Sequence, residues 1–494
     1  MTTRPTERYG AAVDSRLASA FIAAVVTLAW NGASLWRGYF RLDDFAFLHA
    51  NGGLPLRQLL LLPHNEHFLP MWRLEVAALD ALFGIHPMGW IAFGLVVFAL
   101  MLFFVQRVLL AWGVAEAGRA VAVVAIGGWS QWGEILSGYF TLLLWIQLMV
   151  FACAAFLLQR RISSGPPHSR DVSALGLLLA ATAGFGEAAL WVPVAVLIVA
   201  MVDVFADTRT GMPLRDAVRP RRWPIALASV IVAIAASLYV LALSRAGPEL
   251  MRASHASAVV SLGTRFMLLL KFLADVTLAP WRVLHTAPIP AWSAAALRAV
   301  VTMATVAMLL AQLWVSAPRL RRAAVACALI IGFYALLVTL GRPFDPGVWP
   351  AKHIGVPFVF LAMLTALATQ ALIERTPARK VRALPFALCA AFFLVMQLAT
   401  ETFAMHRGWP EGRREEWIIA GRRRAAIAAL RDSIVAPQLA NGVHEIPDLP
   451  METIQGVSIH LQLYDLIVYD RFVLPPGSPA RIVRAPGTPV IIPP

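Results

Sequence analysis

Residues 17–45 read LASAFIAAVVTLAWNGASLWRGYFRLDDF. The first part, Leu17–Trp36, is one apolar run, and a helix needs about 20 such residues to cross a bilayer. Asp43 and Asp44 stand side by side just past that run. The apolar run is too long for a cleaved signal peptide, and no small-residue cleavage site separates the run from a polar mature chain. The stretch therefore predicts a retained membrane helix with two carboxylates at its outer interface.

The composition of the whole chain is that of a membrane protein. Of its 494 residues, 59% are hydrophobic and 14% are charged, against roughly 45–50% and about 25% in soluble domains. This balance excludes a soluble enzyme, a disordered chain and a fibrous protein. The apolar runs predict an all-α polytopic membrane protein with about eleven transmembrane helices. The candidate segments are Leu17–Trp36, Met88–Trp112, Arg119–Trp129, Leu136–Leu158, Val172–Phe185, Ala188–Phe205, Pro224–Leu243, Trp292–Val315, Ala323–Leu340, His353–Ile373 and Leu384–Thr400.

The basic residues predict the orientation. Cytoplasmic loops of membrane proteins carry an excess of Lys and Arg, and here alternate gaps between the apolar runs are basic. The N-terminus is therefore predicted to be cytoplasmic and the C-terminus periplasmic. Nearly all of the positive charge is Arg, which is typical of GC-rich bacterial coding, so we predict a bacterial inner-membrane protein. Because the positive charges lie mainly in short gaps between apolar runs, we predict no nucleic-acid partner. The basic gaps hold Arg4, Arg8 and Arg16; Arg160, Arg161 and Arg170; Arg209, Arg215, Arg219, Arg221 and Arg222; Arg319, Arg321 and Arg322; and Arg375, Arg379, Lys380 and Arg382.

Three long outer segments follow from this topology. The first, 37–87, joins the first two crossings. The second, Ser244–Pro290, contains the apolar run Phe266–Trp281, which is interrupted by Lys271 and Asp275 and is predicted to lie on the outer surface as an interfacial helix. The third is the tail after Glu401. We therefore predict a transmembrane domain over residues 1–400 and a small extracytoplasmic C-terminal domain over 401–494, with a helix first and then short strands.

Short motifs recur at the outer ends of the predicted helices. After the Asp43-Asp44 pair, the first loop reads His67-Phe68-Leu69-Pro70 and then Leu82-Phe83-Gly84-Ile85-His86-Pro87. Trp132-Gly133-Glu134 follows the third candidate segment, and Gly186-Glu187 precedes the sixth.

This series of motifs resembles the GT-C superfamily, the integral-membrane glycosyltransferases that use polyprenyl-phosphate sugars. It is most similar to bacterial relatives of the protein O-mannosyltransferases, and the resemblance covers roughly residues 17–373. Two departures stand out: Gly186 takes the place of the usual Lys, and a His-Pro before Glu134 is missing. The resemblance implies that Asp43, the first acid of the pair, is catalytic.

The chemistry of such a transfer needs few groups. Displacement at C1 of a sugar phosphate has an anionic leaving group of low basicity, so a general acid is unnecessary, in contrast to glycoside hydrolysis. One base is needed to deprotonate the acceptor hydroxyl, and one positive site for the phosphate. We assign the base to Asp43, while Asp44 orients the acceptor, shares a proton or helps to bind a divalent cation; a single attack predicts inversion. The alternative is structural, with Asp43 capping a surface helix that starts at Asp44.

The predicted phosphate site is the outer loop before the segment His353–Ile373. Arg342, Lys352 and His353 are its candidates, because a helix N-terminus there would add its dipole to the cations. Lys352 is equally well explained as an interfacial anchor. Arg265 and Lys271 are the next candidates, although Lys271 also fits the polar face of an interfacial helix.

His67, Glu134 and Glu187 complete the predicted substrate-binding residues. His67 flanks Glu66 together with His64, but no third metal ligand is evident nearby, so a hydrogen-bonding role is favoured over zinc. For Glu134 and Glu187 the alternative is a structural pairing across the helix bundle.

The predicted function is therefore transfer of a hexosyl or pentosyl group from a polyprenyl-phosphate donor to a hydroxyl of an envelope glycan, lipid or protein. Two other classes stay open. A flippase for lipid-linked glycans should line its central path with charge, whereas here charge gathers at the outer ends. An O-antigen polymerase or ligase acts on the same carriers but typically relies on Arg and His in a late loop.

Overall fold

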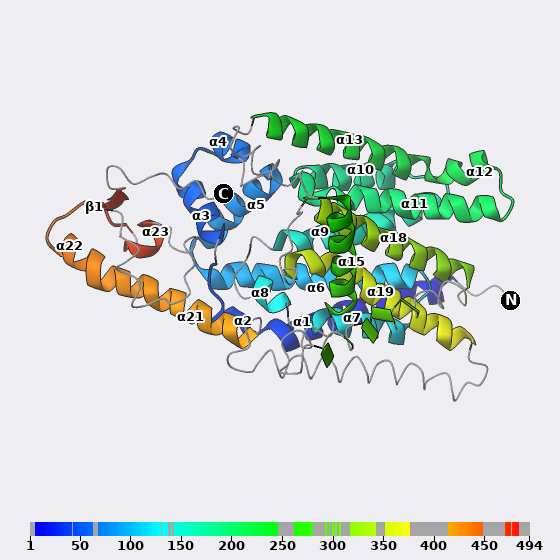
Figure 1. Cartoon of the computed structure of the whole chain (residues 1–494), viewed down its shortest axis with the longest axis horizontal. Helices are drawn as coiled ribbons and strands as arrows, with labels where there is room; N and C mark the ends of the chain where they lie inside the picture. The colour runs from blue at the N-terminus through cyan, green and yellow to red at the C-terminus, as the bar shows by residue number, and fades with distance from the viewer. Residues whose placement is uncertain are drawn as a thin grey trace. The chain divides into compact units, whose positions relative to one another are not determined.

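A computed structural model describes residues 5–41, 43–62, 68–129, 131–136, 140, 143–245, 261–279, 317–341, 351–375, 413–447, 470–475 and 477–483, with scattered positions between 292 and 307. Within these ranges, six helices are long and apolar enough to cross a membrane. They are α6 (Pro87–Ala111), α9 (Leu143–Ser163), α11 (Trp191–Arg209), α13 (Arg222–Arg245), α18 (Pro318–Gly341) and α19 (Ala351–Arg375) (Figure 1). The prediction of an all-α polytopic membrane protein is confirmed.

Three further predicted crossings are also helical. They correspond to α1 (Pro5–Asn31), α7 (Glu116–Gly127) and α10 (Ser169–Ala183). Of the remaining two, Leu384–Thr400 lies outside the described residues, and Trp292–Val315 is described only at scattered positions.

Two predicted membrane segments are divided differently in the structure. The run Leu17–Trp36 is not one helix, because α1 ends at Asn31 and a separate turn, α2 (Ser34–Arg37), follows. Asn and Gly are weak helix formers, and Asn31-Gly32 marks the break. Likewise, the segment predicted to begin at Leu136 begins at Leu143 in α9, since Trp132–Leu136 forms its own short helix, α8.

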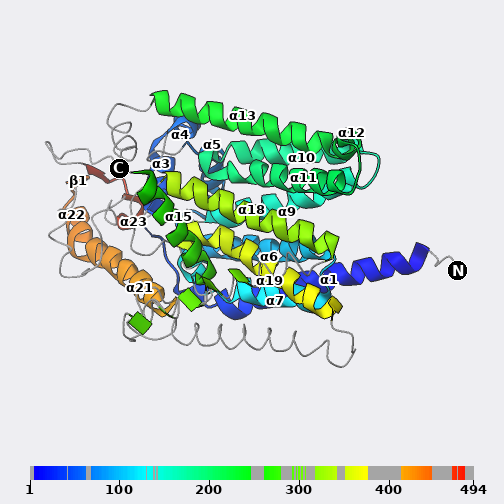
Figure 2. The ribbon, with the colours of Figure 1, turned by 45° about the vertical axis from the view of Figure 1, so that its right-hand side comes forward.

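The chain divides into two compact units. Unit 1 comprises Met1–Trp30, Val96–Ser130 and Trp145–Phe403. Its core is α19, whose apolar stretch His353–Ala371 is completely buried. A helix that is apolar all round can satisfy every face only inside a bundle, and α19 packs against α18, α7 and α15. In the same unit α10, α11 and α13 run side by side (Figures 1 and 2).

The predicted interfacial helix is α15 (Leu262–Thr277), which begins four residues before the predicted start. Ser261 caps it by accepting a hydrogen bond from the backbone N–H of Thr264 at 3.2 Å. One face buries Leu268, Phe272 and Val276, while other apolar side chains are exposed. In both ribbon views α15 runs across α18 rather than along it (Figures 1 and 2), which supports an interfacial position.

Unit 2 comprises Asn31–Leu95, Gln131–Leu144 and Ala404–Pro494, so the first outer loop and the tail fold together. Its loop helices are α3 (Asp43–Gly53), α4 (Leu56–Leu61) and α5 (Pro70–Phe83). In the tail, α21 (Arg413–Leu430) continues through a π-helical turn, Arg431–Val435, into α22 (Ala436–Ala440), and α23 (Asp470–Val473) lies farther along the chain. Strands β1 (Glu445–Pro447) and β2 (Arg481–Val483) pair in parallel, with Ile446 opposite Ile482.

We expect reporter fusions to reveal a cytoplasmic Gly211 and Pro318 and an extracytoplasmic Pro494, because of the excess of Arg in the alternate gaps. Gly211 lies in an exposed turn directly after α11, where a fusion disturbs no packing. Paired alkaline phosphatase and green fluorescent protein fusions are the measurement. Phosphatase activity at Gly211 or fluorescence at Pro494 would contradict the predicted orientation.

Candidate active site

The Asp43-Asp44 pair opens α3 in unit 2. The Asp44 side chain is completely buried. Its Oδ2 accepts hydrogen bonds from the backbone N–H of Arg41 at 2.9 Å and of Phe140 at 3.3 Å, and the Asp44 N–H donates to the Arg41 carbonyl at 2.9 Å. The side chain of Asp44 thus reaches back to the backbone N–H three residues earlier, as the acidic residue of a capping box does, and the bond to Phe140 ties the start of α3 to a second segment of the chain.

A contact of the capping kind is therefore made by Asp44. The alternative, in which Asp43 caps the helix, is not tested, because it depends on the side chain of Asp43. The side chain of Asp43 lies outside the described part of the chain, so its role as base stays a prediction. A buried carboxylate needs hydrogen-bond donors, and the backbone supplies them to Asp44.

The segment before Asp43 is held by the tail helix α21. The guanidinium of Arg41 forms an ion pair with Glu416. The Trp417 indole N–H donates to Ser34 Oγ at 3.4 Å, and Arg424 Nη2 donates to the Arg37 and Gly38 carbonyls at 3.1 and 3.2 Å. The segment 34–41, which leads into the acid pair, is thus held at both ends by a helix that comes more than 370 residues later in the chain.

Helix α5 carries a buried cation, Arg73, that is not among the predicted site residues. Arg73 is only 3% exposed, its Nε donates to the Leu62 carbonyl at 2.8 Å, and its guanidinium lies 4.7 Å from the centre of the Phe47 ring. Phe47 is one helical turn past Asp43 and Asp44, and residues three or four apart are neighbours on a helix. Burial lowers the pKa of Arg73 to about 10, so it is still charged at neutral pH.

A second tail contact holds the other end of α3. Arg471 on α23 forms two hydrogen bonds of 2.8 Å with the carboxylate of Asp80 on α5, and its Nη1 also donates to the Leu48 carbonyl at 2.9 Å. Asp80 is nearly buried in this pair. We call the Asp80–Arg471 pair the clasp. Between the two tail contacts, the aromatic rings of Phe40, Phe45 and Phe472 pack within 4.9–6.3 Å of one another.

Of the other predicted site residues, the structure describes the side chain of His353 alone. His353 is buried in α19, where its ring lies 6.3 Å from that of Trp145. It belongs to unit 1 and Asp44 to unit 2, so their convergence stays a prediction. His67 and Arg342 lie outside the described residues, as do the side chains of Lys352, Glu134 and Glu187.

Two motif glycines adopt backbone conformations that other residues avoid. Gly186 has φ = 69°, which explains why this position does not carry the Lys of the GT-C pattern. Gly84 has φ = 57° at the end of α5, and its carbonyl accepts a 2.9 Å hydrogen bond from the Trp90 indole. Among the described residues, no group of three or more His, Cys, Asp or Glu side chains is placed to hold a metal ion.

No protein-family model matches the chain, and no curated protein sequence does. A solved structure does match: the crystal structure of ArnT from Cupriavidus metallidurans bound to undecaprenyl phosphate. The match covers 95% of this chain and 86% of that one, with a TM-score of 0.50 and 13% sequence identity. The chain has the GT-C fold. This confirms the fold that the motif order implied, and the GT-C bundle here carries its acid pair at the start of α3.

Proposed function

We propose that the protein is an inverting glycosyltransferase that moves a sugar from a polyprenyl-phosphate donor to a hydroxyl acceptor on the outer face of the membrane. The observation that carries the proposal is the fold likeness over 95% of the chain to ArnT, whose crystal structure contains undecaprenyl phosphate. The acid pair at the start of α3 adds the base that such a transfer requires.

In the proposed reaction the acceptor oxygen attacks C1 of the sugar as Asp43 takes its proton. The new C1–O bond forms while the bond from C1 to the phosphate oxygen breaks, and its electron pair leaves with the lipid phosphate. Asp44 has a different task. Because its Oδ2 accepts two backbone N–H groups, it fixes the first turn of α3 and so positions Asp43.

The leaving phosphate gains charge as the bond breaks, so a fixed cation beside it lowers the barrier. Lys352, Arg342 and His353 remain the proposed cations of the late loop. Arg73 is added to them, because its buried guanidinium lies over the ring of Phe47, which is one helical turn past the acid pair, and a guanidinium binds phosphate with paired hydrogen bonds. His67, Glu134 and Glu187 are proposed to bind the sugar or the acceptor through hydrogen bonds.

We expect Lys352→Ala, Arg342→Ala and Arg73→Ala to raise the KM for the donor by about 10- to 100-fold, with a smaller change in the KM for the acceptor. A hydrogen bond to a charged group contributes roughly 1.5–3 kcal/mol. Initial rates at varied donor concentration are the measurement, and Arg481→Ala, an exposed residue of the tail, is the control. Unchanged donor dependence in all three variants would move the phosphate site to Arg265 or Lys271.

The acceptor class is proposed to be an envelope glycan, lipid or protein, and the sugar a hexose or pentose. Mass spectrometry of envelope glycans from cells with and without the gene would identify both. The reaction class has a separate test in purified protein in detergent. Without a bilayer there are no two compartments, so flipping of a lipid cannot be observed but sugar transfer can. Transfer of labelled sugar under these conditions supports a transferase, whereas a flippase would produce no new glycosidic bond.

A further inference from the structure

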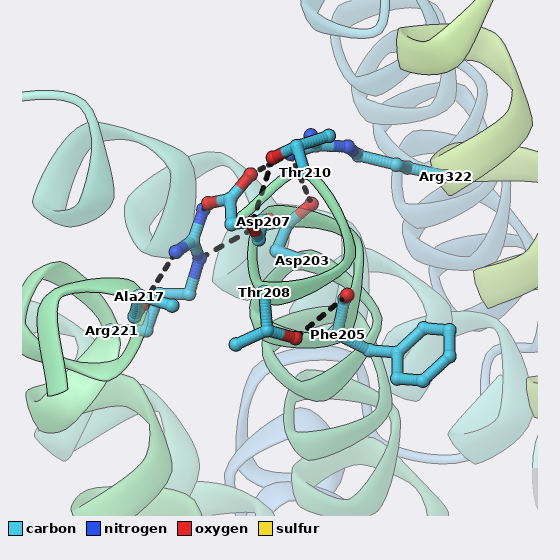
Figure 3. A network of polar contacts seen from close by, with 8 residues as sticks. All are labelled: Asp203, Phe205, Asp207, Thr208, Thr210, Ala217, Arg221 and Arg322. Atoms are coloured by element: carbon cyan, nitrogen blue, oxygen red, sulfur yellow. Dashed lines mark hydrogen bonds and ion pairs between the residues drawn. The ribbon is translucent and has the colours of Figure 1, made fainter. Parts of the chain in front are cut away.

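A polar network ties together three helical segments of unit 1. Asp203 and Asp207 lie one turn apart on α11. Asp207 is 2.7 Å from both Arg221, on the turn Arg219–Arg221, and Arg322 on α18. Asp203 adds longer contacts of 3.8 and 4.0 Å to the same two arginines, and Figure 3 shows the carboxylates between them. These ion pairs hold the basic ends of the helices in place.

A cavity of about 470 Å³ opens beside this network. Its lining comes from the ends of α9, α11 and α18. The charged lining is Arg160, Arg221, Arg319, Arg322 and the carboxylate of Asp203, so the arginines outnumber the acid. Gln159 and Ser163 add uncharged polar groups, and residues such as Trp112 and Phe156 form the apolar wall. Pockets for small ligands have volumes of roughly 300–1,000 Å³, so the cavity is large enough for a phosphate headgroup with the first part of its attached chain.

The polar lining contains groups without a partner. Gln159 is only 2% exposed, yet neither its Nε2 nor its Oε1 has a hydrogen-bond partner among the described residues. The buried Oγ of Ser163, one turn along α9 on the same face, also lacks one. Buried polar groups in native proteins are almost always hydrogen-bonded. Both residues belong to the wall of the cavity, and a rotation of either side chain would bring its unpaired donor to a ligand oxygen.

The charge of the lining favours an anion. Arg221 and Arg322 are paired with Asp207, and Arg319 is 2.6 Å from Glu374. Arg160 lines the same cavity and has no ion pair among the described residues. A guanidinium presents a planar set of N–H donors that matches phosphate geometry.

We propose that this cavity binds a phosphate group, carried by an anionic membrane lipid. Arg160, Gln159 and Ser163 donate to the phosphate oxygens, and the apolar wall receives the start of the acyl chains. The cavity lies at the Arg-rich helix ends, which are predicted to be cytoplasmic, where anionic lipids are concentrated. The proposal concerns unit 1 alone and does not depend on the sugar transfer.

The test is lipid binding by the purified full chain in a neutral detergent. Phosphatidylglycerol and phosphatidylcholine are titrated separately and bound lipid is counted by native mass spectrometry. We expect phosphatidylglycerol to bind at least 10-fold more tightly. Arg160→Ala should reduce that preference about 10-fold, as loss of one charged hydrogen bond does, and Gln159→Leu should also weaken it while keeping the size of the side chain.

The matched control is Arg161→Ala. Arg161 is the next residue and is largely exposed, but it is paired with Asp171 at 3.5 Å and does not line the cavity. If inorganic phosphate displaces bound lipid but phosphatidylglycerol binds no more tightly than phosphatidylcholine, the phosphate site is supported and its ligand is free phosphate. Equal effects of Arg160→Ala and Arg161→Ala, or no difference between the two lipids and no competition by phosphate, would overturn the proposal.

Discussion

Asp43→Asn is expected to lower sugar transfer by 10²- to 10⁴-fold, the typical loss when a general base is removed, while the protein stays folded. Carboxylate and amide are nearly the same size, so packing changes little, but an amide cannot take the proton of the acceptor hydroxyl. A purely capping side chain predicts the opposite, because Asn caps a helix about as well as Asp and the substitution would then be almost silent.

The measurement is transfer of labelled sugar from a polyprenyl-phosphate donor by purified variants, with thermal unfolding recorded beside it. Asp44→Asn is the internal comparison: it keeps one oxygen for the N–H groups of Arg41 and Phe140 and should cost less activity. Near-normal turnover by Asp43→Asn would remove Asp43 as the base. Near-normal turnover by the Asp43→Asn, Asp44→Asn double variant would remove the proposed mechanism altogether.

Breaking the clasp is expected to have the largest effect on stability. Asp80→Ala leaves the guanidinium of Arg471 without its carboxylate, and removing one partner from a buried pair costs about 3–5 kcal/mol. Because the Arg471 side chain is 30% exposed, we expect a loss of about 2–3 kcal/mol of unfolding free energy, just below the range for fully buried pairs. The loss should appear as a lower unfolding midpoint and as faster proteolysis within the tail.

The matched control for the clasp is Glu445→Ala, which breaks another pair of the same unit. Glu445 and Arg481 link β1 to β2, but both side chains are well exposed, and exposed pairs contribute little. The midpoint of this variant should stay at the wild-type value. If Asp80→Ala and Glu445→Ala shift the midpoint equally, the clasp does not hold the tail.

The long apolar helices were predictable because their signal is local. A run such as Met88–Trp112 or Ala323–Leu340 needs no partner to be recognised, since the bilayer requires about 20 apolar residues whatever their order. The errors fell at polar or small residues inside such runs. Asn31-Gly32 ends α1, and the separate turn α8 delays the start of α9, and neither interrupts the apolar composition enough to be seen.

The contacts of the candidate site were not predictable, because they join residues far apart in the chain. Arg41 and Glu416 are separated by 375 residues, and nothing in either neighbourhood specifies the other. The sequence contains a weak signal for Arg73. Pro70 at the first position of α5 favours a helix start, which places the only basic residue of that helix, Arg73, in its first turn.

The clasp also sets an order of events during synthesis. Asp80 and Arg471 are 391 residues apart, and at about 5–20 residues per second a ribosome needs roughly 20–80 s to travel between them. In the predicted topology the acid-bearing loop has been exported throughout that interval without its closing partner. Unit 2 is then completed only after the tail has been made and exported, and a ribosome that stalls before Arg471 leaves an inserted but unfinished protein.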